Sequence, residues 1–396
     1  MTDKARIPVV LSGVRTPMGR FLGGLAPLQA PQLGAITVAE AVRRAGIDPG
    51  EVEEVIMGNV VPAGAGQAPA RQAAIHGGIP ATIPSMTINK VCGSGLKAVM
   101  LAAQAIKAGD YQVAVAGGFE SMSNVPYYLR NHRGGVKFGD QTLQDGLIYD
   151  GLWCSFGNCH MGGYAEYTAD KAGITREEAD EFAYNSHRKA VAAIENGKFK
   201  DEIIPVEIKH RKGVNVVDTD ESPRADTTME ALARLRPAFP KDAPEGIENL
   251  IVTAGNAPGL NDGAASLVVA SQAFAEAHGL PIQAFIQNYA VGSTEPKELF
   301  FAPIDAIRKL MARDEKTIGE YDLFEVNEAF AVQAIPDMRA LDMDEARVNV
   351  HGGAGASGAR VLVTLLYAMK DRGDTSGMAA LCLGGGNAVA LSVEMR

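Results

Sequence analysis

One pattern of turn, helix and strand occurs twice in this chain, and it limits the possible folds more than any other feature. In the first copy, a Gly-rich turn at Cys92 precedes apolar residues at helical spacing from Leu96 to Ile106. Gly109-Asp110 ends that helix, and Val113 to Ala116 reads as a buried strand that runs into two glycines. The segment is therefore expected to be one turn–helix–strand unit.

The second copy lies near the C-terminus. Val348 to Val350 leads into a Gly-rich turn at 355–360, and Leu362 to Met369 continues at helical spacing. Gly373-Asp374 then ends the helix, and Met378 to Leu383 forms an apolar run before three glycines. Because the elements repeat in order at similar intervals, the sequence predicts two similar α/β halves with pseudo-twofold symmetry.

The segment between the halves has a different texture. Residues 122–253 contain aromatic loops, a charged helix from Thr175 to Asn196 and a polar stretch at 209–226. We interpret this segment as a lid that covers a ligand, with a purely structural insertion as the alternative. The predicted domains are a first half at 1–121 completed by about 254–283, a loop domain at 122–253 and a second half at 284–396.

Composition excludes several classes of protein. The 396 residues are 46% hydrophobic and 21% charged, which allows a large core. The net charge of -10, without a long Lys/Arg run, argues against nucleic-acid binding. Four cysteines in so long a chain do not form a disulfide scaffold, and Cys154 and Cys159 lack the second ligand pair of a zinc site. We find no targeting signal or apolar membrane span, and therefore expect a cytoplasmic protein without a bound metal.

Cys92 is a candidate nucleophile. It lies between a strand-like run ending at Val91 and a helix start at Ser94, with glycines at 93 and 95. Helix N-terminal amides lower a cysteine pKa from about 8.5 toward neutrality, and glycines let backbone amides approach a bound carbonyl closely. A buried structural cysteine in a Gly-rich turn is the alternative for this motif alone.

Further motifs extend over nearly the whole length of the chain, among them Asn89-Lys90-Val91-Cys92-Gly93-Ser94-Gly95 and Cys382-Leu383-Gly384-Gly385-Gly386. These motifs also include Val14-Arg15-Thr16-Pro17, Gly117-Gly118-Phe119-Glu120-Ser121, Asn261-Asp262-Gly263-Ala264-Ala265 and Asn327-Glu328-Ala329-Phe330-Ala331. Together they make the chain resemble the thiolases, the acyl-CoA C-acyltransferases. The resemblance implies a thiolase-like α/β fold, in which two duplicated halves form a layered α-β-α-β-α core with an inserted loop domain.

The resemblance also implies a reaction and roles. Two acetyl-CoA molecules would condense to acetoacetyl-CoA and CoA, or a 3-ketoacyl-CoA would undergo thiolysis. Cys92 would take the acyl group, and Cys382 would act as the acid/base at the α-carbon of the second substrate. Backbone amides of Cys92 and Gly384 would hold the acyl oxygen, and Asn327 would hold a water near the second thioester oxygen. Alone, Cys382 reads as a core residue and Asn327 as a helix cap.

By the same resemblance, a further set of residues would bind coenzyme A, which is a substrate and not a cofactor. The positions are His160, Met161, Arg224, Phe239, Ala257, Ala329 and Phe330. Arg224 would supply a cation in an acidic protein, with Lys209, Arg211 and Lys212 as alternatives that otherwise serve only surface solvation. The family also implies a homodimer or homotetramer, with no nucleic-acid or membrane partner.

The chain departs from the family at one catalytic motif. Thiolases carry a histidine in a Gly-His-Pro turn before the second Gly-rich helix start, whereas here Gly352-Gly353-Ala354 runs directly into Gly355-Ala356. General acid/base help is typically worth about 10²- to 10⁴-fold, so we expect impaired chemistry unless another group, such as His351, replaces it. The alternative function is therefore a thiolase-fold binder of CoA thioesters with little catalysis. A decarboxylating ketoacyl synthase is disfavoured because those enzymes use histidine where Cys382 stands.

Overall fold

A single large sheet forms the centre of the molecule. The computed structural model describes residues 3–353 and 355–396. Ten strands of this described part form one sheet in the order β14-β15-β16-β13-β1-β12-β5-β3-β4, with β2 paired to β12. The strands are β1 (Pro8–Arg15), β2 (Gly19–Arg20), β3 (Glu54–Gly58), β4 (Ser85–Ile88), β5 (Val113–Ser121), β12 (Asn261–Ser271), β13 (Ala284–Ser293), β14 (Leu323–Val326), β15 (Ser376–Leu383) and β16 (Asn387–Glu394).

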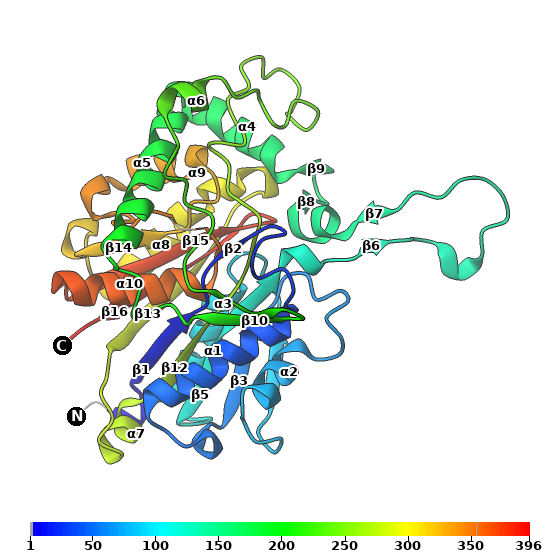
Figure 1. Cartoon of the computed structure of the whole chain (residues 1–396). Helices are drawn as coiled ribbons and strands as arrows, with labels where there is room; N and C mark the ends of the chain where they lie inside the picture. The colour runs from blue at the N-terminus through cyan, green and yellow to red at the C-terminus, as the bar shows by residue number, and fades with distance from the viewer. Residues whose placement is uncertain (1–2, 354) are drawn as a thin grey trace.

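Helices pack on both faces of this sheet, and two of them lie between its two halves (Figure 1). They are α1 (Ala30–Ala45), α2 (Pro69–His76), α3 (Ser94–Ala108), α4 (Met161–Ala172), α5 (Arg176–Glu195), α6 (Met229–Ala233), α7 (Gln272–Ala277), α8 (Ala302–Asp314), α9 (Ala331–Leu341) and α10 (Ala359–Arg372). In the described part of the chain, none of these helices has the length and apolar character to cross a membrane.

The strand order shows the predicted duplication. β1 and β13 pair with each other at the centre, through Val9↔Phe285 and Val10↔Ala284. Moving outward, the first half continues with β12, β5 and β3, and the second half with β16, β15 and β14. The helices α3 and α10, which the sequence predicted as equivalent, contact each other. Each ends at a glycine in the left-handed region, Gly109 at φ 86° and Gly373 at φ 73°.

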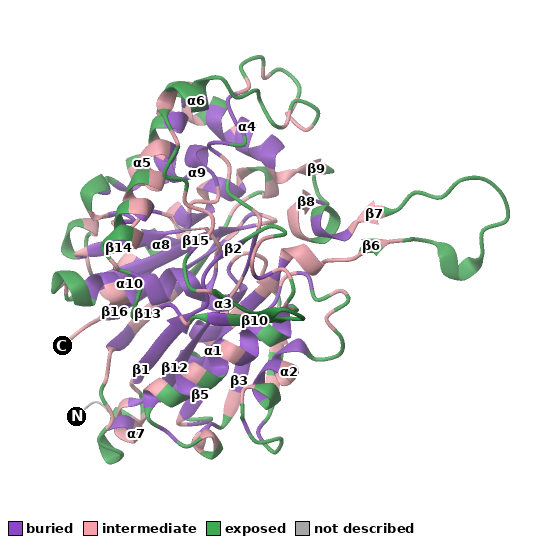
Figure 2. Cartoon of the chain, viewed as in Figure 1, coloured by how far each residue is buried: buried purple, intermediate pink, exposed green. Residues whose placement is uncertain are grey.

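Three apolar clusters give the five layers. The middle cluster combines α3 and α10 with inward-facing residues of both half-sheets, such as Leu267 of β12 and Leu381 of β15. Alternate residues of the same strands face outward, because side chains of a strand point to opposite sides. Val268 packs with α1 and α2, and Ala380 packs with α8. Figure 2 shows this buried interior beneath an exposed outer surface, and the predicted layered α/β fold is confirmed.

The segment Val348–Val350, which leads into the second Gly-rich turn, is not a strand. Val348 makes only an isolated parallel bridge to Phe324, and no ladder runs through Val348 to Val350. Asn349 has a φ of 46°, and its side chain takes the place of the missing ladder. Its Oδ1 accepts from the Val326 amide at 2.8 Å and its Nδ2 donates to the Val326 carbonyl at 2.8 Å.

Residues 122–253 include a long arm and a cap. The arm, residues 127–145, extends from the body, beginning with β6 (Tyr127–Tyr128) and returning with β7 (Gln144–Asp145) (Figure 1). The cap contains α4, α5, α6 and the hairpin β8 (Trp153–Cys154) to β9 (Cys159–His160). The hairpin β10 (Val206–His210) to β11 (Gly213–Val217) packs instead on the outer layer of the first half, beside α1. After this segment the chain returns to the sheet as β12, which pairs with both β1 and β5. The division into three domains stays a prediction.

Candidate active site

The turn that holds Cys92 is fixed by hydrogen bonds and by backbone strain. Ser94 Oγ accepts from the Lys90 amide at 2.8 Å and donates to the Val91 carbonyl at 2.6 Å. Val91 has a φ of 49°, in the left-handed region that a β-branched residue rarely adopts. The turn therefore places Cys92 directly before Gly93, the N-cap of α3.

The surroundings of the Cys92 thiol correct one expectation. Burial raises its pKa, and hydrogen bonds from the backbone amides of Cys92 and Gly384 lower it only in part, while the charge of Glu120 raises it further. The net direction is upward, opposite to the sequence expectation, because packing outweighs the amides. The structure nevertheless brings together the two amides that were predicted to act as a pair.

Cys382 lies close to Cys92. It is the penultimate residue of β15 and is 2% exposed. Burial raises its pKa well above the ordinary value, and the charges of Cys92 and Asp337 raise it further. The two cysteines do not hold equivalent places in the duplication, because Cys92 follows β4 whereas the counterpart of β15 is β5. They meet through the packing of the two halves.

Asn327 follows β14 and is 6% exposed. Its backbone N–H donates to the Ala380 carbonyl of β15 at 2.9 Å, which fixes Asn327 beside the strand that carries Cys382. The next residue, Glu328, accepts from Ser186 Oγ at 2.6 Å and from Asn349 Nδ2 at 2.7 Å. The Asn327 side chain makes no hydrogen bond with other residues in the described ranges.

The predicted acyl-end residues lie together in one apolar cluster. Cys382 and Phe330 belong to it, with Met161, Phe239, Ala257 and Ala329 packed against it. His160 joins by stacking on Phe239, with ring centroids 4.7 Å apart. The His160 Nδ1 accepts from the Gly162 amide at 3.0 Å, and burial lowers the pKa of this histidine, which favours the neutral ring. The wall beside Cys382 is therefore aromatic and uncharged.

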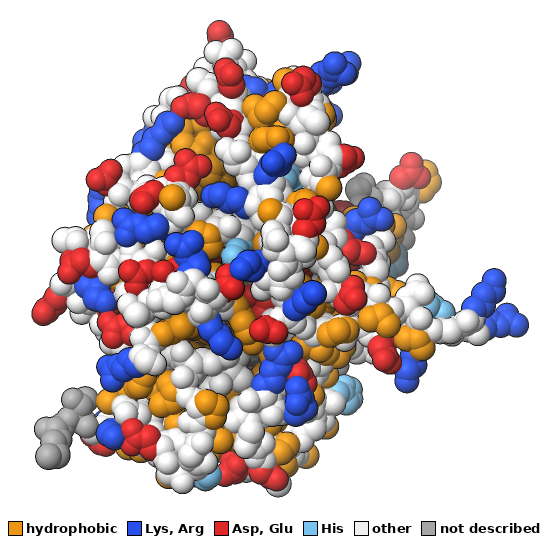
Figure 3. All heavy atoms as spheres, turned by 60° about the vertical axis from the view of Figure 1, so that its left-hand side comes forward, with side chains coloured by type: hydrophobic (Ala, Val, Ile, Leu, Met, Phe, Trp, Pro, Cys, Tyr) orange, Lys and Arg blue, Asp and Glu red, His pale blue; other side chains and the backbone are white. Residues whose placement is uncertain are grey.

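Arg224 lies apart from this cluster, on an exposed loop. The Arg224 amide donates to His187 Nδ1 of α5 at 3.3 Å. The alternative cations Lys209, Arg211 and Lys212 are exposed on the β10–β11 hairpin. Figure 3 shows Lys/Arg and Asp/Glu side chains interspersed over one face of the molecule, so cationic side chains are present on this face although the net charge is -10.

Comparison with known proteins decides the family. Residues 8–273 match the description "Thiolase, N-terminal domain", and residues 280–395 match "Thiolase, C-terminal domain". The chain belongs to the thiolase family.

Individual thiolases are similar to this chain over nearly their whole length. An acetyl-CoA acetyltransferase of Pseudomonas aeruginosa is 50% identical, with 97% of this chain and 98% of that protein covered. A protein of the same name from Cupriavidus necator is 50% identical, with 98% and 99% covered. The crystal structure of the Bacillus anthracis acetyl-CoA acetyltransferase superposes with a TM-score of 0.94 at 42% identity, covering 98% of both chains.

His351 of this thiolase, the candidate replacement for the missing catalytic histidine, packs against Phe199 and not against the two cysteines. Its ring meets the Phe199 ring edge-on, with centroids 5.8 Å apart. Burial lowers its pKa to about 4, and the charges that act on it come from Asp371, Lys198, Arg372 and Arg15. Gly358, at the end of the 355–358 turn, packs against the backbone of the turn that carries the nucleophile, because a Cβ on it would lie 3.4 Å from the Gly95 nitrogen and 3.7 Å from the Cys92 carbonyl oxygen. Ala354, at the site of the missing motif, lies outside the described residues.

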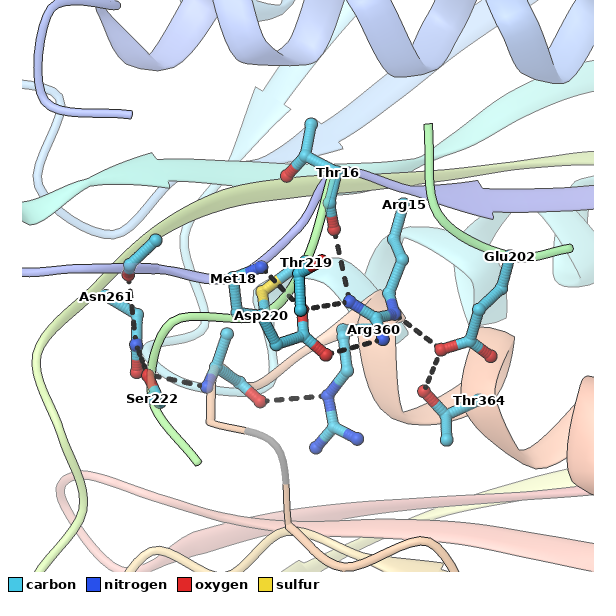
Figure 4. Close-up of polar contacts among 12 residues, drawn as sticks. Arg15, Thr16, Met18, Glu202, Thr219, Asp220, Ser222, Asn261, Arg360 and Thr364 are labelled. Atoms are coloured by element: carbon cyan, nitrogen blue, oxygen red, sulfur yellow. Dashed lines mark hydrogen bonds and ion pairs between the residues drawn. The ribbon is translucent and has the colours of Figure 1, made fainter. Parts of the chain in front are cut away.

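A buried ion network, missed by sequence reasoning, supports this thiolase site (Figure 4). Arg15 is 0% exposed and binds Glu202 at 2.6 Å and Asp220 at 2.7 Å. Ser222, two residues after Asp220, accepts from Asn261 Nδ2 at 2.6 Å, and Asn261 Oδ1 accepts from the Ala356 amide at 3.2 Å. The motif containing Arg15 was visible in the sequence, but arginines are rarely buried and its partners lie far along the chain.

No metal site accompanies this network. Over residues 3–353 and 355–396 there is no group of three or more His, Cys, Asp and Glu side chains placed to bind a metal ion.

Proposed function

We propose that this thiolase is an acetyl-CoA C-acetyltransferase. It would catalyse the reversible condensation of two acetyl-CoA molecules, or thiolysis of a 3-ketoacyl-CoA. The relatives from Pseudomonas aeruginosa, Cupriavidus necator and Escherichia coli carry the name acetyl-CoA acetyltransferase. The observation that carries the proposal is the convergence of the Cys92 and Cys382 thiols and the Gly384 amide at one place.

In the first step, Cys92 attacks the thioester carbonyl, and CoA leaves as its thiol with a proton that Cys382 gives up. Cys382 thereby becomes the thiolate that acts as base in the second step. The amides of Cys92 and Gly384 donate to the oxyanion of the tetrahedral intermediate, and each such donor is worth roughly 3 kcal/mol in comparable sites. Because the pKa of Cys92 is raised, a base must take its proton during attack.

In the second step, Cys382 removes a proton from the methyl group of the second acetyl-CoA. The resulting carbanion attacks the acyl group on Cys92 and forms the new carbon–carbon bond. The thioester bond to Cys92 breaks, and the Cys92 sulfur takes back the proton that the base removed in the first step. Asn327, whose amide is fixed beside β15, supports the developing enolate oxygen through a water. His160, Met161, Phe239, Ala257, Ala329 and Phe330 exclude water around the acyl and pantetheine parts, and Arg224 meets a phosphate of CoA.

Thiolysis of acetoacetyl-CoA tests this proposal. The purified chain should release acetyl-CoA in the presence of CoA, and the Cys92→Ala variant should lose this turnover. Cys159→Ala removes a half-buried thiol of the nearby hairpin and serves as a matched control that keeps activity. A third variant restores a Gly-His-Pro turn between Gly353 and Gly355. Turnover that appears only after this restoration would show that the unmodified chain binds CoA thioesters without the proposed catalysis.

We also propose a cytoplasmic homodimer or homotetramer. β4 is an edge strand with Met86 40% exposed, so it offers an edge for pairing with a second copy. The arm carries Phe138 at 99% exposure and Leu143 at 61% exposure, which are apolar side chains that contact with another copy would bury.

A further inference from the structure

Asp337 is a buried acid that the proposed mechanism does not use. It lies on α9 and is 1% exposed. Its Oδ2 accepts from Gln333 Nε2 at 2.7 Å, whereas its Oδ1 has no hydrogen-bond partner among the described residues. Burial raises the pKa of this carboxyl well above its usual value, and the Gln333 bond lowers it only in part. Burial therefore disfavours the charged form of this carboxyl.

Gln333 connects this acid to the turn that carries Asn327. Gln333 is 0% exposed, and its Oε1 accepts from the Ala329 amide at 3.1 Å. The side-chain oxygen of Gln333 therefore faces Ala329, and its side-chain nitrogen faces Asp337. A continuous chain of hydrogen bonds therefore runs from Asp337 to a residue two positions after Asn327.

The same helix borders the second catalytic thiol. Val332 and Ile335 of α9 pack in the apolar cluster that contains Cys382. The charge state of Asp337 also acts on Cys382, since a carboxylate at this position would raise the pKa of the thiol. Asp337 is thus linked to the site of carbon–carbon bond formation by a hydrogen-bond chain and by electrostatics.

We propose that Asp337 and Gln333 are a positioning pair for the second step of the reaction. Asp337 orients Gln333, and Gln333 holds the Asn327–Phe330 turn through the Ala329 amide. The proposal rests on the proposed function, and it assigns the pair to the carbon–carbon step and not to acylation of Cys92.

Two partial reactions separate these steps. Exchange of labelled CoA into acetyl-CoA requires acylation of Cys92 only, whereas condensation and loss of deuterium from the acetyl methyl group require Cys382. The variants are Asp337→Leu, Asp337→Asn and Gln333→Met, the last of which keeps the approximate shape but removes both hydrogen bonds. Tyr111→Phe is the matched control, because Tyr111 carries another buried, unpartnered oxygen, in the middle cluster.

We expect Asp337→Leu and Gln333→Met to lower the kcat of condensation and the rate of deuterium loss at least tenfold, while CoA exchange changes less than threefold. Asp337→Asn should stay within threefold in both assays, because an amide is uncharged and still offers an acceptor to Gln333. The Tyr111→Phe control should change neither rate.

Three results would overturn the inference. They are equal losses in both partial reactions that follow the melting temperature, unchanged condensation in Gln333→Met, and an Asn variant as slow as the Leu variant. If Asp337→Leu does not fold, Gln333→Met and Asp337→Asn still decide. Absence of Cys92-dependent exchange in the unmodified chain would overturn the proposed function itself, and this inference with it.

Discussion

At the residue scale, Glu120 adjusts the nucleophile from outside its turn. Its carboxylate accepts from the Val60 amide at 2.7 Å and from Asn59 Nδ2 at 2.8 Å. Burial raises its pKa to about 7, with a smaller upward contribution from the charge of Asp262. Glu120 therefore titrates near neutral pH, and its ionised form raises the pKa of Cys92.

The Glu120→Gln variant tests this coupling. Below pH 7 it should alkylate at Cys92 as fast as the unmodified chain, because Glu120 is protonated there. Above pH 7 it should alkylate faster, because the carboxylate that disfavours the thiolate is gone. The measurement is the pH dependence of iodoacetamide labelling at Cys92, read by mass spectrometry. Identical profiles in the two proteins would contradict the coupling.

The same residue gives a stability effect with a defined sign. Its pKa in the folded protein, about 7, lies above the ordinary value of 4.5, so the folded state binds this proton more tightly. The corresponding contribution to the free energy of unfolding is present below pH 4.5 and is lost as the pH rises through 7. The Gln variant should lack this decline, which urea unfolding across that range measures.

At the element scale, local periodicity predicted most helices and strands. The strand predicted at Val113 to Ala116 is the first part of β5, and the helix predicted from Thr175 to Asn196 is α5 between those two caps. Such elements follow from residues that are neighbours in the sequence. The Val348–Val350 segment forms no strand ladder, because the Asn349 side chain makes hydrogen bonds in its place.

The candidate site was predictable in its residues and less so in its electrostatics. Family motifs gave Cys92, Cys382 and the aromatic cluster, but the raised pKa of Cys92 depends on burial by distant parts of the chain. A Cβ on Gly93, for example, would lie 2.3 Å from a Leu383 side-chain carbon. Asp337 gave no signal in the sequence, since an acid on a helix is normally solvated.

The arm gives a prediction at this scale. Replacing residues 129–143 with a short turn should leave the body folded, because the exposed arm contributes no residue to the core clusters. If the arm joins copies, the variant should form a smaller oligomer with unchanged thiolysis per subunit. Light scattering coupled to size exclusion measures this, and an unchanged mass would contradict a role of the arm in assembly.

At the scale of the whole molecule, Arg15 joins parts of the chain that are far apart in sequence. Glu202 and Asp220 belong to the 122–253 segment, and Thr364 of α10 donates to Glu202 at 3.2 Å (Figure 4). All four side chains are buried, and Arg15 lies at the end of β1. The network therefore connects the first half, the 122–253 segment and the second half at one point.

The Arg15→Met variant should be strongly destabilised. It would leave two buried carboxylates without their partner, a change that costs about 3–5 kcal/mol in comparable cases. The control is Lys4→Ala, which breaks an exposed pair with Glu276 and should cost about 0–1 kcal/mol. Urea unfolding compares the two variants, and similar losses would contradict a central role for Arg15.

The position of β12 has a consequence for synthesis on the ribosome. β1 and β5 lie on either side of β12, yet β12 is translated only after residues 122–253 have emerged. Chains grow from the N-terminus, so the edges of β1 and β5 that later pair with β12 stay open during that interval. A ribosome that stalls before residue 271 would thus hold a polypeptide with unpaired strand edges, and a chaperone that covers them would protect the chain while the middle segment is translated.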